Sequence, residues 1–312
     1  MLNDKMIHNY IAFILKIKNQ YINEERGMIY LNGFTFPAAE MEFNFFMSVK
    51  RTCYDTYYPF KILSKNGFER VEFEPITIFY GGNGSGKSTA LNVIAEKLAL
   101  NRDSIYNKSN FFHDYVDMCS AALMREIPEN SRIITSDDVF DYMLNIRNLN
   151  EGIDQKREEL FEEYLEVKYA HFQMRSMEDY DQLKKVNKSR SKTQSRYVRS
   201  EIMDNVREYS NGESAFKYFT EKIDENGLYL LDEPENSLSP KRQLELMKFI
   251  EESVRFFHCQ FIISTHSPFL LGMKDAKIYN LDENPVKLQS WTALENVRIY
   301  YDFFKSHESD FQ

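Results

Sequence analysis

The stretch that decides the fold is a glycine-rich nonapeptide, Gly81-Gly82-Asn83-Gly84-Ser85-Gly86-Lys87-Ser88-Thr89. It fits the pattern G-x-x-x-x-G-K-[ST], in which a glycine-rich loop joins a strand to a helix. Residues 76–80 are β-branched and aromatic, and they predict a short buried strand before the loop. After the loop, Leu91, Ile94, Ala95 and Leu98 recur at helical spacing. This order of strand, loop and helix predicts a phosphate-binding loop rather than a chance glycine-rich turn.

Each part of this loop has a chemical reason in phosphate binding. Glycines let backbone N–H groups curl around phosphate oxygens without Cβ clashes, and the following helix directs its positive N-terminus at the anion. The ammonium group of Lys87 can reach the β- and γ-phosphates, and the hydroxyl of Ser88 is a ligand for Mg²⁺. We therefore expect residues 81–89 to bind ATP together with Mg²⁺.

Two adjacent carboxylates end an apolar segment in the last third of the chain, where residues 228–240 read Leu-Tyr-Leu-Leu-Asp-Glu-Pro-Glu-Asn-Ser-Leu-Ser-Pro. Side chains alternate between the two faces of a strand. The strand must therefore end here if Asp232 and Glu233 are to serve one site, and Pro234 favours that end. Beside a phosphate loop, this Walker B arrangement favours function over a solvated acidic turn. Asp232 is predicted to hold Mg²⁺ through its water shell, and Glu233 to orient or deprotonate the attacking water.

A histidine follows another predicted strand, where residues 261–268 read Phe-Ile-Ile-Ser-Thr-His-Ser-Pro. Ligands of parallel sheets usually bind at the carboxyl ends of the strands, so we expect His266 at the edge where the phosphate loop lies. A lone histidine is more often structural. At this edge, however, a neutral imidazole can hydrogen-bond both the γ-phosphate and the water. The predicted catalytic residues are therefore Lys87, Glu233 and His266.

Residues 209–214, Tyr-Ser-Asn-Gly-Glu-Ser, are an ordinary helix-start turn when taken alone. In the order phosphate loop, this hexapeptide, Walker B and histidine, the motifs resemble the ABC-type ATPases. The resemblance implies an α/β P-loop NTPase of the ABC-ATPase type, with a mainly parallel sheet, an antiparallel β-layer and a helical lobe. It also implies a nucleotide-dependent, head-to-tail homodimer that hydrolyses ATP to ADP and phosphate. In such a dimer, Ser210, Asn211 and Gly212 cap the γ-phosphate bound by the second copy.

The closer resemblance is to small non-transporter members of this group, which are AAA-family ATPases similar to the heads of SMC and double-strand-break-repair ATPases. It covers roughly residues 58–312 and rests on DEPENSLSP, STHSPFLL and the C-terminal stretch from Asp275. Transporter ATPases usually carry a glutamine loop, yet no glutamine occurs between Ser88 and Ile153. Ser239 stands where an aspartate is usual in the family.

The aromatic residue that stacks on adenine is not evident from the motifs. Three aromatic side chains before the phosphate loop are candidates: Tyr58, Phe60 and Phe68.

Composition indicates a globular, cytoplasmic protein. The chain has 312 residues, of which 43% are hydrophobic and 28% charged, and its net charge is −9. A field of that sign does not attract nucleic acid or an anionic membrane, so any such contact needs a local basic patch. The three cysteines are far apart and show no CxxC spacing, which argues against a disulfide framework or a zinc site. No apolar stretch reaches the roughly 18 residues of a membrane span, so no membrane contact is expected.

The sequence divides into an N-terminal extension, residues 1–27, and an ATPase domain, residues 28–312. Apolar residues at helical spacing predict an amphipathic helix in the extension. Residues 28–80 are expected to form the antiparallel β-layer, because apolar residues alternate there. A helical lobe is expected at about residues 102–226.

The charge changes sign inside this lobe: residues 151–166 contain seven acids, and residues 184–199 contain seven bases and no acid. The basic run suggests a DNA-related role in repair, chromosome maintenance or phage defence, but it can equally be a solvated linker that pairs with the acidic helix. A regulatory ATPase that controls a partner effector, such as a toxin or nuclease, is the alternative. An ATPase subunit of a transporter is the least favoured, because the glutamine loop is missing.

Overall fold

The computed structural model describes residues 28–50, 53–169, 179–206 and 211–311. The helix expected at residues 1–27 lies outside the described residues. The chain forms two compact units: a larger unit that runs to Val139 and resumes at Asn211, and a helical unit, Phe140–Ser210. No described helix is long and apolar enough to span a membrane.

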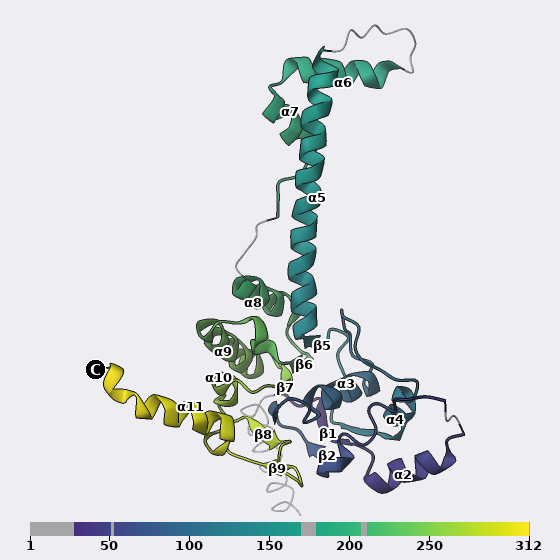
Figure 1. Ribbon diagram of the computed structural model, residues 1–312, viewed down its shortest axis with the longest axis vertical. Coiled ribbons are helices and arrows are strands. Elements are labelled where there is room, and N and C mark those ends of the chain that lie inside the picture. Colours follow the sequence, from purple (N-terminus) through teal and green to yellow (C-terminus); the bar gives the residue numbers. More distant parts are fainter. Residues whose placement is uncertain (1–27, 51–52, 170–178, 207–210, 312) are drawn as a thin grey trace, which may run out of the picture. The chain divides into compact units, whose positions relative to one another are not determined.

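The larger unit contains a six-stranded sheet in the order β5-β6-β7-β3-β8-β9 (Figure 1). Its strands are β3 (Ile76–Tyr80), β5 (Arg132–Thr135), β6 (Leu228–Asp232), β7 (Gln260–Ser264), β8 (Lys277–Asn280) and β9 (Lys287–Leu288). All neighbours pair in parallel except β8 and β9. The strands predicted before the phosphate loop, in Walker B and before His266 are confirmed, and their carboxyl ends lie at one edge because they run parallel.

A second, three-stranded antiparallel sheet has the order β2-β1-β4, formed by β1 (Leu31–Thr35), β2 (Arg70–Glu72) and β4 (Ser120–Leu123). The expected β-layer is confirmed, but its composition differs from the expectation in two ways. Its third strand comes from beyond residue 80, and the helix α2 (Ala39–Ser48) interrupts residues 28–80. The helix forms because one of its faces packs on aromatic residues: Phe45 stacks on Phe60 with ring centroids 4.6 Å apart.

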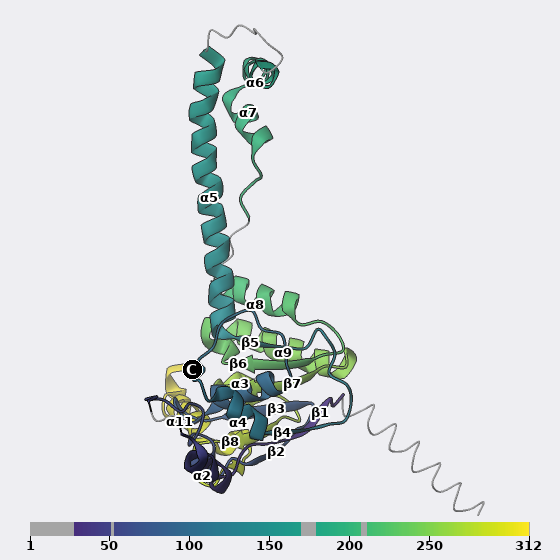
Figure 2. The ribbon, with the colours of Figure 1, turned by 90° about the vertical axis from the view of Figure 1, so that its right-hand side faces the viewer.

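Helices pack on the main sheet and join the two sheets. The helix α3 (Lys87–Lys97) contacts β5, β6 and β7 and lies alongside both sheets in Figure 2. Its Leu91 and Ile94 share one buried cluster with Phe34 of β1 and Leu230 of β6.

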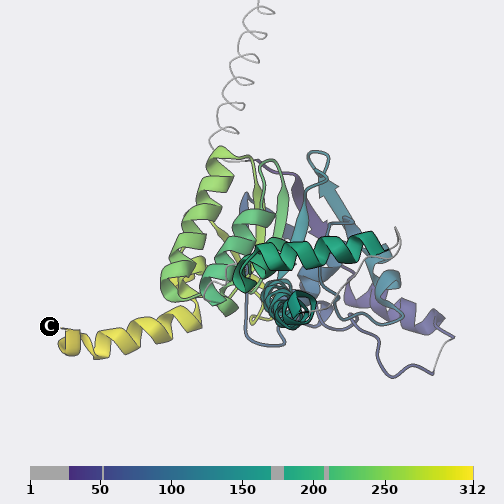
Figure 3. The ribbon, with the colours of Figure 1, turned by 90° about the horizontal axis from the view of Figure 1, so that it is seen from above.

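The helices α8 (Asn211–Lys222) and α9 (Pro240–Phe256) lie side by side in Figures 1 and 3. The short helices are α4 (Phe112–Met118), α10 (Pro268–Leu271), η1 (Ser64–Asn66), η3 (Pro234–Ser237), η4 (Trp291–Ala293) and η5 (Glu308–Phe311).

The C-terminal helix α11 (Glu295–Ser306) begins on the body of the larger unit. Val297 in its first turn is buried, whereas several of its aromatic side chains, among them Tyr301 and Phe303, are more than half exposed.

The helical unit contains most of α5 (Ser136–Tyr169), together with α6 (Tyr180–Ser191) and α7 (Gln194–Glu201). A small apolar cluster joins α7 to α5 through Leu160, Tyr164, Tyr197 and Val198. The expected helical lobe at 102–226 is interrupted by strands β4 and β5. These strands form because their backbone groups find partners in β1 and β6, which are distant in sequence.

Candidate functional site

The phosphate loop, residues 81–86, connects the end of β3 to the first turn of α3. Gly84 and Gly86 have φ angles of 82° and 99°, in the left-handed region that favours glycine. A Cβ atom on Gly86 would lie 2.9 Å from Cδ2 of Leu63, so the loop leaves no space for a side chain there. The loop therefore carries its backbone amides to the N-terminus of α3, where the helix dipole favours an anion.

Lys87, the first residue of α3, is only 4% exposed. Its Nζ donates hydrogen bonds to the carbonyl oxygens of Gly81 at 2.7 Å and Gly82 at 3.1 Å. The same Nζ lies 3.5 Å from Oε1 of Glu233. The cation of the phosphate loop is thus in ion-pair contact with the second carboxylate of Walker B.

The start of the phosphate loop is fixed by a residue that sequence reasoning missed. Both carboxylate oxygens of Asp282 accept the N–H of Gly82, each at 2.9 Å. The N–H of Ser85 donates to the carbonyl of Gly82 at 3.2 Å, which closes the turn, and Asn83 is exposed at its tip. Asp282 follows β8, which is the neighbour of β3, so an acid after that strand is the signal by which it can be found.

Ser88 and Asp232 form the next contact across the site. The Oγ of Ser88 donates to Oδ1 of Asp232 at 3.0 Å, and the Oγ of Ser264 donates to the same oxygen. Burial raises the pKa of Asp232, and the negative charge of Glu233 raises it further. The two serine hydrogen bonds and the positive charge of Lys87 lower the pKa in part. A hydroxyl and a carboxylate oxygen, both hard donors, therefore meet beside the phosphate loop.

Glu233 shows how two consecutive carboxylates come to serve one site. The strand β6 ends at Asp232, and Glu233 takes a left-handed backbone conformation with φ of 48°. Its N–H donates to the carbonyl oxygen of Ser264 at 3.0 Å, while Pro234 opens η3. The strand thus ends where Pro234 was expected to favour its end. Because Glu233 has a left-handed backbone conformation, its side chain does not follow the strand's alternation to the opposite face of the sheet.

His266 lies two residues beyond β7 and is 46% exposed. Its Nδ1 is 3.9 Å from Oε1 of Glu233 and 3.5 Å from Oε1 of Glu235. Lys87, Glu233 and His266 therefore meet in one place, as the parallel-sheet argument predicts. Glu235, the next acid of the Asp-Glu-Pro-Glu sequence, is 6% exposed and was missed by sequence reasoning.

Two of the three candidates for adenine stacking are excluded by burial. Phe60 and Phe68 are 5% and 2% exposed and pack in the core of the larger unit. Tyr58 is half-buried, and its hydroxyl donates to Oγ1 of the buried Thr89 at 3.2 Å. Its ring stacks on that of Phe112. The two phenylalanines therefore pack in the hydrophobic core and are not accessible to an adenine ring.

Asn211 and Gly212 begin α8, while Ser210 lies outside the described residues. A Cβ atom on Gly212 would lie 3.5 Å from the carbonyl oxygen of Ser237 and 3.8 Å from the backbone nitrogen of Ser239. The start of α8 thus packs on the segment that follows Walker B in the same chain. Ser239 also caps α9, because its side chain accepts the N–H of Arg242, as expected from the pair Ser239-Pro240.

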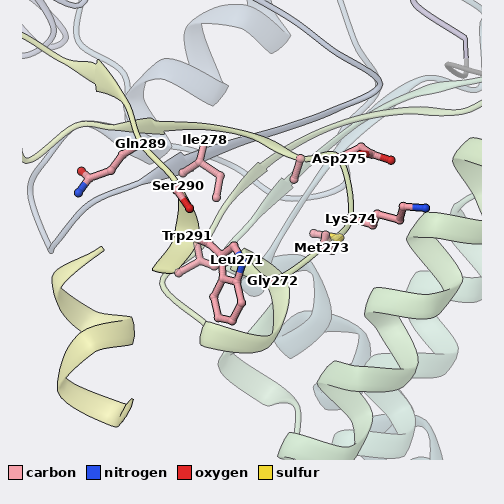
Figure 4. Close-up of a pocket in the computed structure, with 10 residues that line it drawn as sticks. Leu271, Gly272, Met273, Lys274, Asp275, Ile278, Gln289, Ser290 and Trp291 are labelled. Atoms are coloured by element: carbon pink, nitrogen blue, oxygen red, sulfur yellow. The ribbon is translucent and has the colours of Figure 1, made fainter. Parts of the chain in front are cut away.

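A cavity of about 370 Å³ lies elsewhere on the larger unit (Figure 4). Its lining includes Leu271, Met273, Ile278 and Trp291. No residue predicted for nucleotide binding or catalysis lines this cavity. Among the described residues, no group of three or more His, Cys, Asp and Glu side chains is arranged to hold a metal ion alone.

The phosphate loop on α3, the carboxylates after β6 and the histidine after β7 define a P-loop ATP hydrolase. More particularly, residues 146–271 match the family described as the AAA ATPase domain, which confirms the resemblance inferred from the motifs. The matched part contains Asp232, Glu233 and His266 but not the phosphate loop, and it is less than half of the chain. No match was found among curated proteins.

Similar solved structures include an ABC cassette and SMC heads. The dimeric post-hydrolysis state of the ATP-binding cassette MJ0796 bound to ADP and Pi is 13% identical, with a TM-score of 0.32 over 72% of this chain and 91% of that chain. The SMC head of Pyrococcus furiosus with an extended coiled coil, bound to the C-terminal domain of ScpA, is 15% identical, with a TM-score of 0.35 over 75% and 94%. An SMC head bound to the C-winged helix domain of ScpA is 16% identical, with a TM-score of 0.34 over 70% and 92%.

Proposed function

We propose that two copies of this chain close head-to-tail on ATP and hydrolyse it at composite sites. The observation that carries the proposal is the position of Glu233 Oε1, which lies 3.5 Å from Nζ of Lys87 and 3.9 Å from Nδ1 of His266. All three groups follow the carboxyl ends of parallel strands, at the edge of the main sheet where the phosphate loop lies. In the head-to-tail dimer, the second copy contributes Ser210, Asn211 and Gly212 at the γ-phosphate.

The residues divide the work at the nucleotide. The backbone amides of residues 81–89 and the ammonium of Lys87 bind the phosphates. Glu233 accepts the proton of the attacking water as the new bond to the γ-phosphorus forms and the bond to the β-phosphate oxygen breaks. His266 donates a hydrogen bond to the γ-phosphate. The γ-phosphate is then no longer joined to ADP, so the products no longer link the two copies and the dimer opens.

Mg²⁺ fits the hydroxyl of Ser88 and the carboxylate of Asp232. Mg²⁺ prefers oxygen ligands and is usually bound by one or two protein groups together with substrate phosphates and waters. The two side chains already lie in contact, with Oγ of Ser88 3.0 Å from Oδ1 of Asp232. The burial that raises the pKa of Asp232 is also a reason for a cation to bind there, because a cation stabilises the ionised carboxylate. When bound, Mg²⁺ supplies charge neutralisation for the phosphates.

ATP should therefore hold two copies together, because it contributes contacts that neither free copy has. We expect Glu233→Gln to bind ATP and to accumulate as a dimer, since hydrolysis normally releases the second copy. Light scattering of this variant with and without Mg-ATP measures the change in mass. Glu308→Gln, on the exposed C-terminal turn, is the matched control and should behave as the wild type.

The cross-copy contact has its own test in Ser210→Arg. Bulk and charge at the closing interface should leave ATP binding by the monomer nearly intact and block both dimerisation and hydrolysis. A mass of the Glu233→Gln protein that does not respond to nucleotide, with normal hydrolysis by Ser210→Arg, would refute the composite site and leave the ATP site itself standing.

A second candidate function, DNA binding coupled to the ATPase cycle, is favoured by the surface of α6 and α7. Lys184, Arg196 and Arg199 are exposed there. Two lysines of the basic run form ion pairs: Lys185 contacts Glu163 of the acidic helix, and Lys188 contacts Glu201. Lys184, Arg196 and Arg199 thus add exposed positive charge to α6 and α7 on a chain whose net charge is −9.

If this surface binds DNA, the logarithm of the binding constant should fall linearly with the logarithm of the salt concentration. Replacing Lys184, Arg196 and Arg199 by glutamine should lower the salt slope by about one per lost phosphate contact. Lys156→Gln is the control, because Lys156 is already paired with Glu159. Absence of DNA binding would instead favour the alternative of a regulatory ATPase that controls a partner effector, and unchanged binding by the triple variant would exclude the surface of α6 and α7 as the DNA site.

A further inference from the structure

The turn that carries His266, residues 265–267, is held by a single buried carboxylate. Oε1 of Glu235 accepts a hydrogen bond from Oγ1 of Thr265 at 2.6 Å, from the N–H of His266 at 2.9 Å and from the N–H of Ser267 at 3.2 Å. Glu235 lies on η3 and is 6% exposed. One oxygen atom thus gathers three donors from three consecutive residues.

The other oxygen of Glu235 is not used in holding this turn. Oε2 is buried and has no hydrogen-bond partner among the described residues. Leaving a buried polar atom without a partner costs on the order of 1–3 kcal/mol. A buried carboxylate with one unpaired oxygen is therefore a less stable way to hold this turn than one whose two oxygens are both paired. The carboxylate also lies 3.5 Å from Nδ1 of His266, where its charge faces the imidazole.

The same turn is fixed from its other side by the C-terminal helix. Nδ2 of Asn296 donates to the carbonyl oxygen of His266 at 2.5 Å, and the backbone N–H of Asn296 donates to the hydroxyl of Tyr80 at 3.2 Å. The hydroxyl of Ser267 donates to Oε1 of Gln243 on α9 at 2.6 Å. Residues 265–267 are therefore fixed by three elements, two of which bond the backbone of His266 directly, while the side chain of His266 remains half-exposed.

We propose that Glu235 is a positioning residue that acts through His266. The left-handed turn at Glu233 and the short helix η3 bring both acids to His266, with Oε1 of Glu233 and of Glu235 3.9 Å and 3.5 Å from its Nδ1. Glu233 also contacts Lys87 in the site, whereas Glu235 is buried and accepts hydrogen bonds from the turn after β7. Residues 233–235 therefore supply the general base, Glu233, and also position the imidazole of His266 next to it through Glu235. This inference rests on the proposed role of His266 at the γ-phosphate.

A double-mutant cycle with His266 distinguishes positioning from a general effect on the fold. Glu235→Ala should lower kcat by roughly 10–100-fold, because a displacement of about 1 Å in a catalytic group costs up to that much, and should leave the Kd for ATP within about twofold. In a His266→Ala background, the same change should have little further effect on kcat. Glu252→Ala, an exposed acid on α9, is the matched control and should keep wild-type kcat.

Glu235→Gln separates the hydrogen bonds from the charge. Glutamine keeps an Oε1 that accepts the same three donors, so we expect it to recover part of the kcat lost in Glu235→Ala. Amide hydrogen exchange gives a readout that does not depend on turnover. The amides of His266 and Ser267 should exchange faster in Glu235→Ala than in Glu235→Gln, while core amides of β7 stay protected.

Equal losses of kcat from Glu235→Ala with and without His266 would overturn the proposal, as would unchanged kcat in His266→Ala. Loss of ATP binding or of β7 protection in both Glu235 variants would also overturn it, because the residue would then serve the fold and not the histidine. Failure of nucleotide-dependent dimerisation in Glu233→Gln is a separate result. It would remove the composite site, whereas a non-additive cycle would still support positioning.

Discussion

Lys87 is the residue whose environment most directly predicts a loss of binding. Its buried Nζ already makes two hydrogen bonds to loop carbonyls and lies 3.5 Å from Glu233, so the site stabilises a cation at this point. Charge-assisted hydrogen bonds contribute about 1.5–3 kcal/mol, or roughly tenfold to a hundredfold in affinity. Lys87→Ala should weaken ATP binding by at least about that factor, as measured by titration calorimetry. Exposed Lys305 gives the control, and wild-type affinity in Lys87→Ala would remove Lys87 from phosphate binding.

Asp232 is the residue whose ionisation predicts a dependence of stability on pH. Because burial raises its folded-state pKa, the native protein binds the proton more tightly than the unfolded chain. As the pH rises from the unfolded-state pKa of Asp232 through its higher folded-state pKa, ionisation of Asp232 lowers the free energy of unfolding. Lowering the pH again restores that free energy. Asparagine is neutral at all these pH values and keeps an Oδ1 acceptor for the hydroxyls of Ser88 and Ser264.

Without nucleotide, Asp232→Asn should therefore be more stable than the wild type at neutral pH, and the difference should shrink as the pH falls. Urea unfolding at a series of pH values measures this. A variant that is less stable at neutral pH would show that the serine hydrogen bonds and Lys87 outweigh burial. Hydrolysis by the same variant should be lost, because the proposed Mg²⁺ ligand is gone.

At the scale of elements, β6 carries the two carboxylates and is also part of the core that places them. Leu230 is fully buried, between Ile133 of β5 and Ile262 of β7 in the sheet register. Leu230→Ala removes apolar contacts and leaves a cavity, which costs about 2–5 kcal/mol in the free energy of unfolding. Leu288→Ala on β9 is the control, because Leu288 is 58% exposed and should change stability by less than about 0.5 kcal/mol. Similar urea midpoints for the two variants would contradict this account of the core.

At the scale of the whole molecule, the division into two compact units predicts that a change within the helical unit leaves nucleotide binding by the larger unit unaffected. Tyr197 is 2% exposed and packs on Tyr164, with ring centroids 5.4 Å apart. Tyr197→Ala should release α7 from α5 and speed tryptic cleavage within residues 184–199, while the Kd for ATP stays within about twofold. Tyr180→Ala, at a position 53% exposed, should leave cleavage unchanged. Weakened ATP binding in Tyr197→Ala would show that nucleotide binding depends on the helical unit.

The sequence by itself determined the features whose causes are local. The phosphate loop needs glycine backbones and a lysine within nine consecutive residues, and parallel strands that end in polar residues place Asp232, Glu233 and His266 at one edge. Each of these rules acts over a few residues or follows from the general geometry of parallel sheets. The fold class and the ATP-hydrolysing chemistry were therefore predictable.

Only the tertiary structure decided the contacts between segments that are far apart in the chain. The strand β4 joins β1 across about ninety residues, and α2 forms because Phe45 finds Phe60. Asp282 accepts an amide 200 residues away, and Glu235 gathers donors about 30 residues away. Whether such a carboxylate is solvated or buried depends on which donors the folded chain brings to it, and no local pattern contains that information.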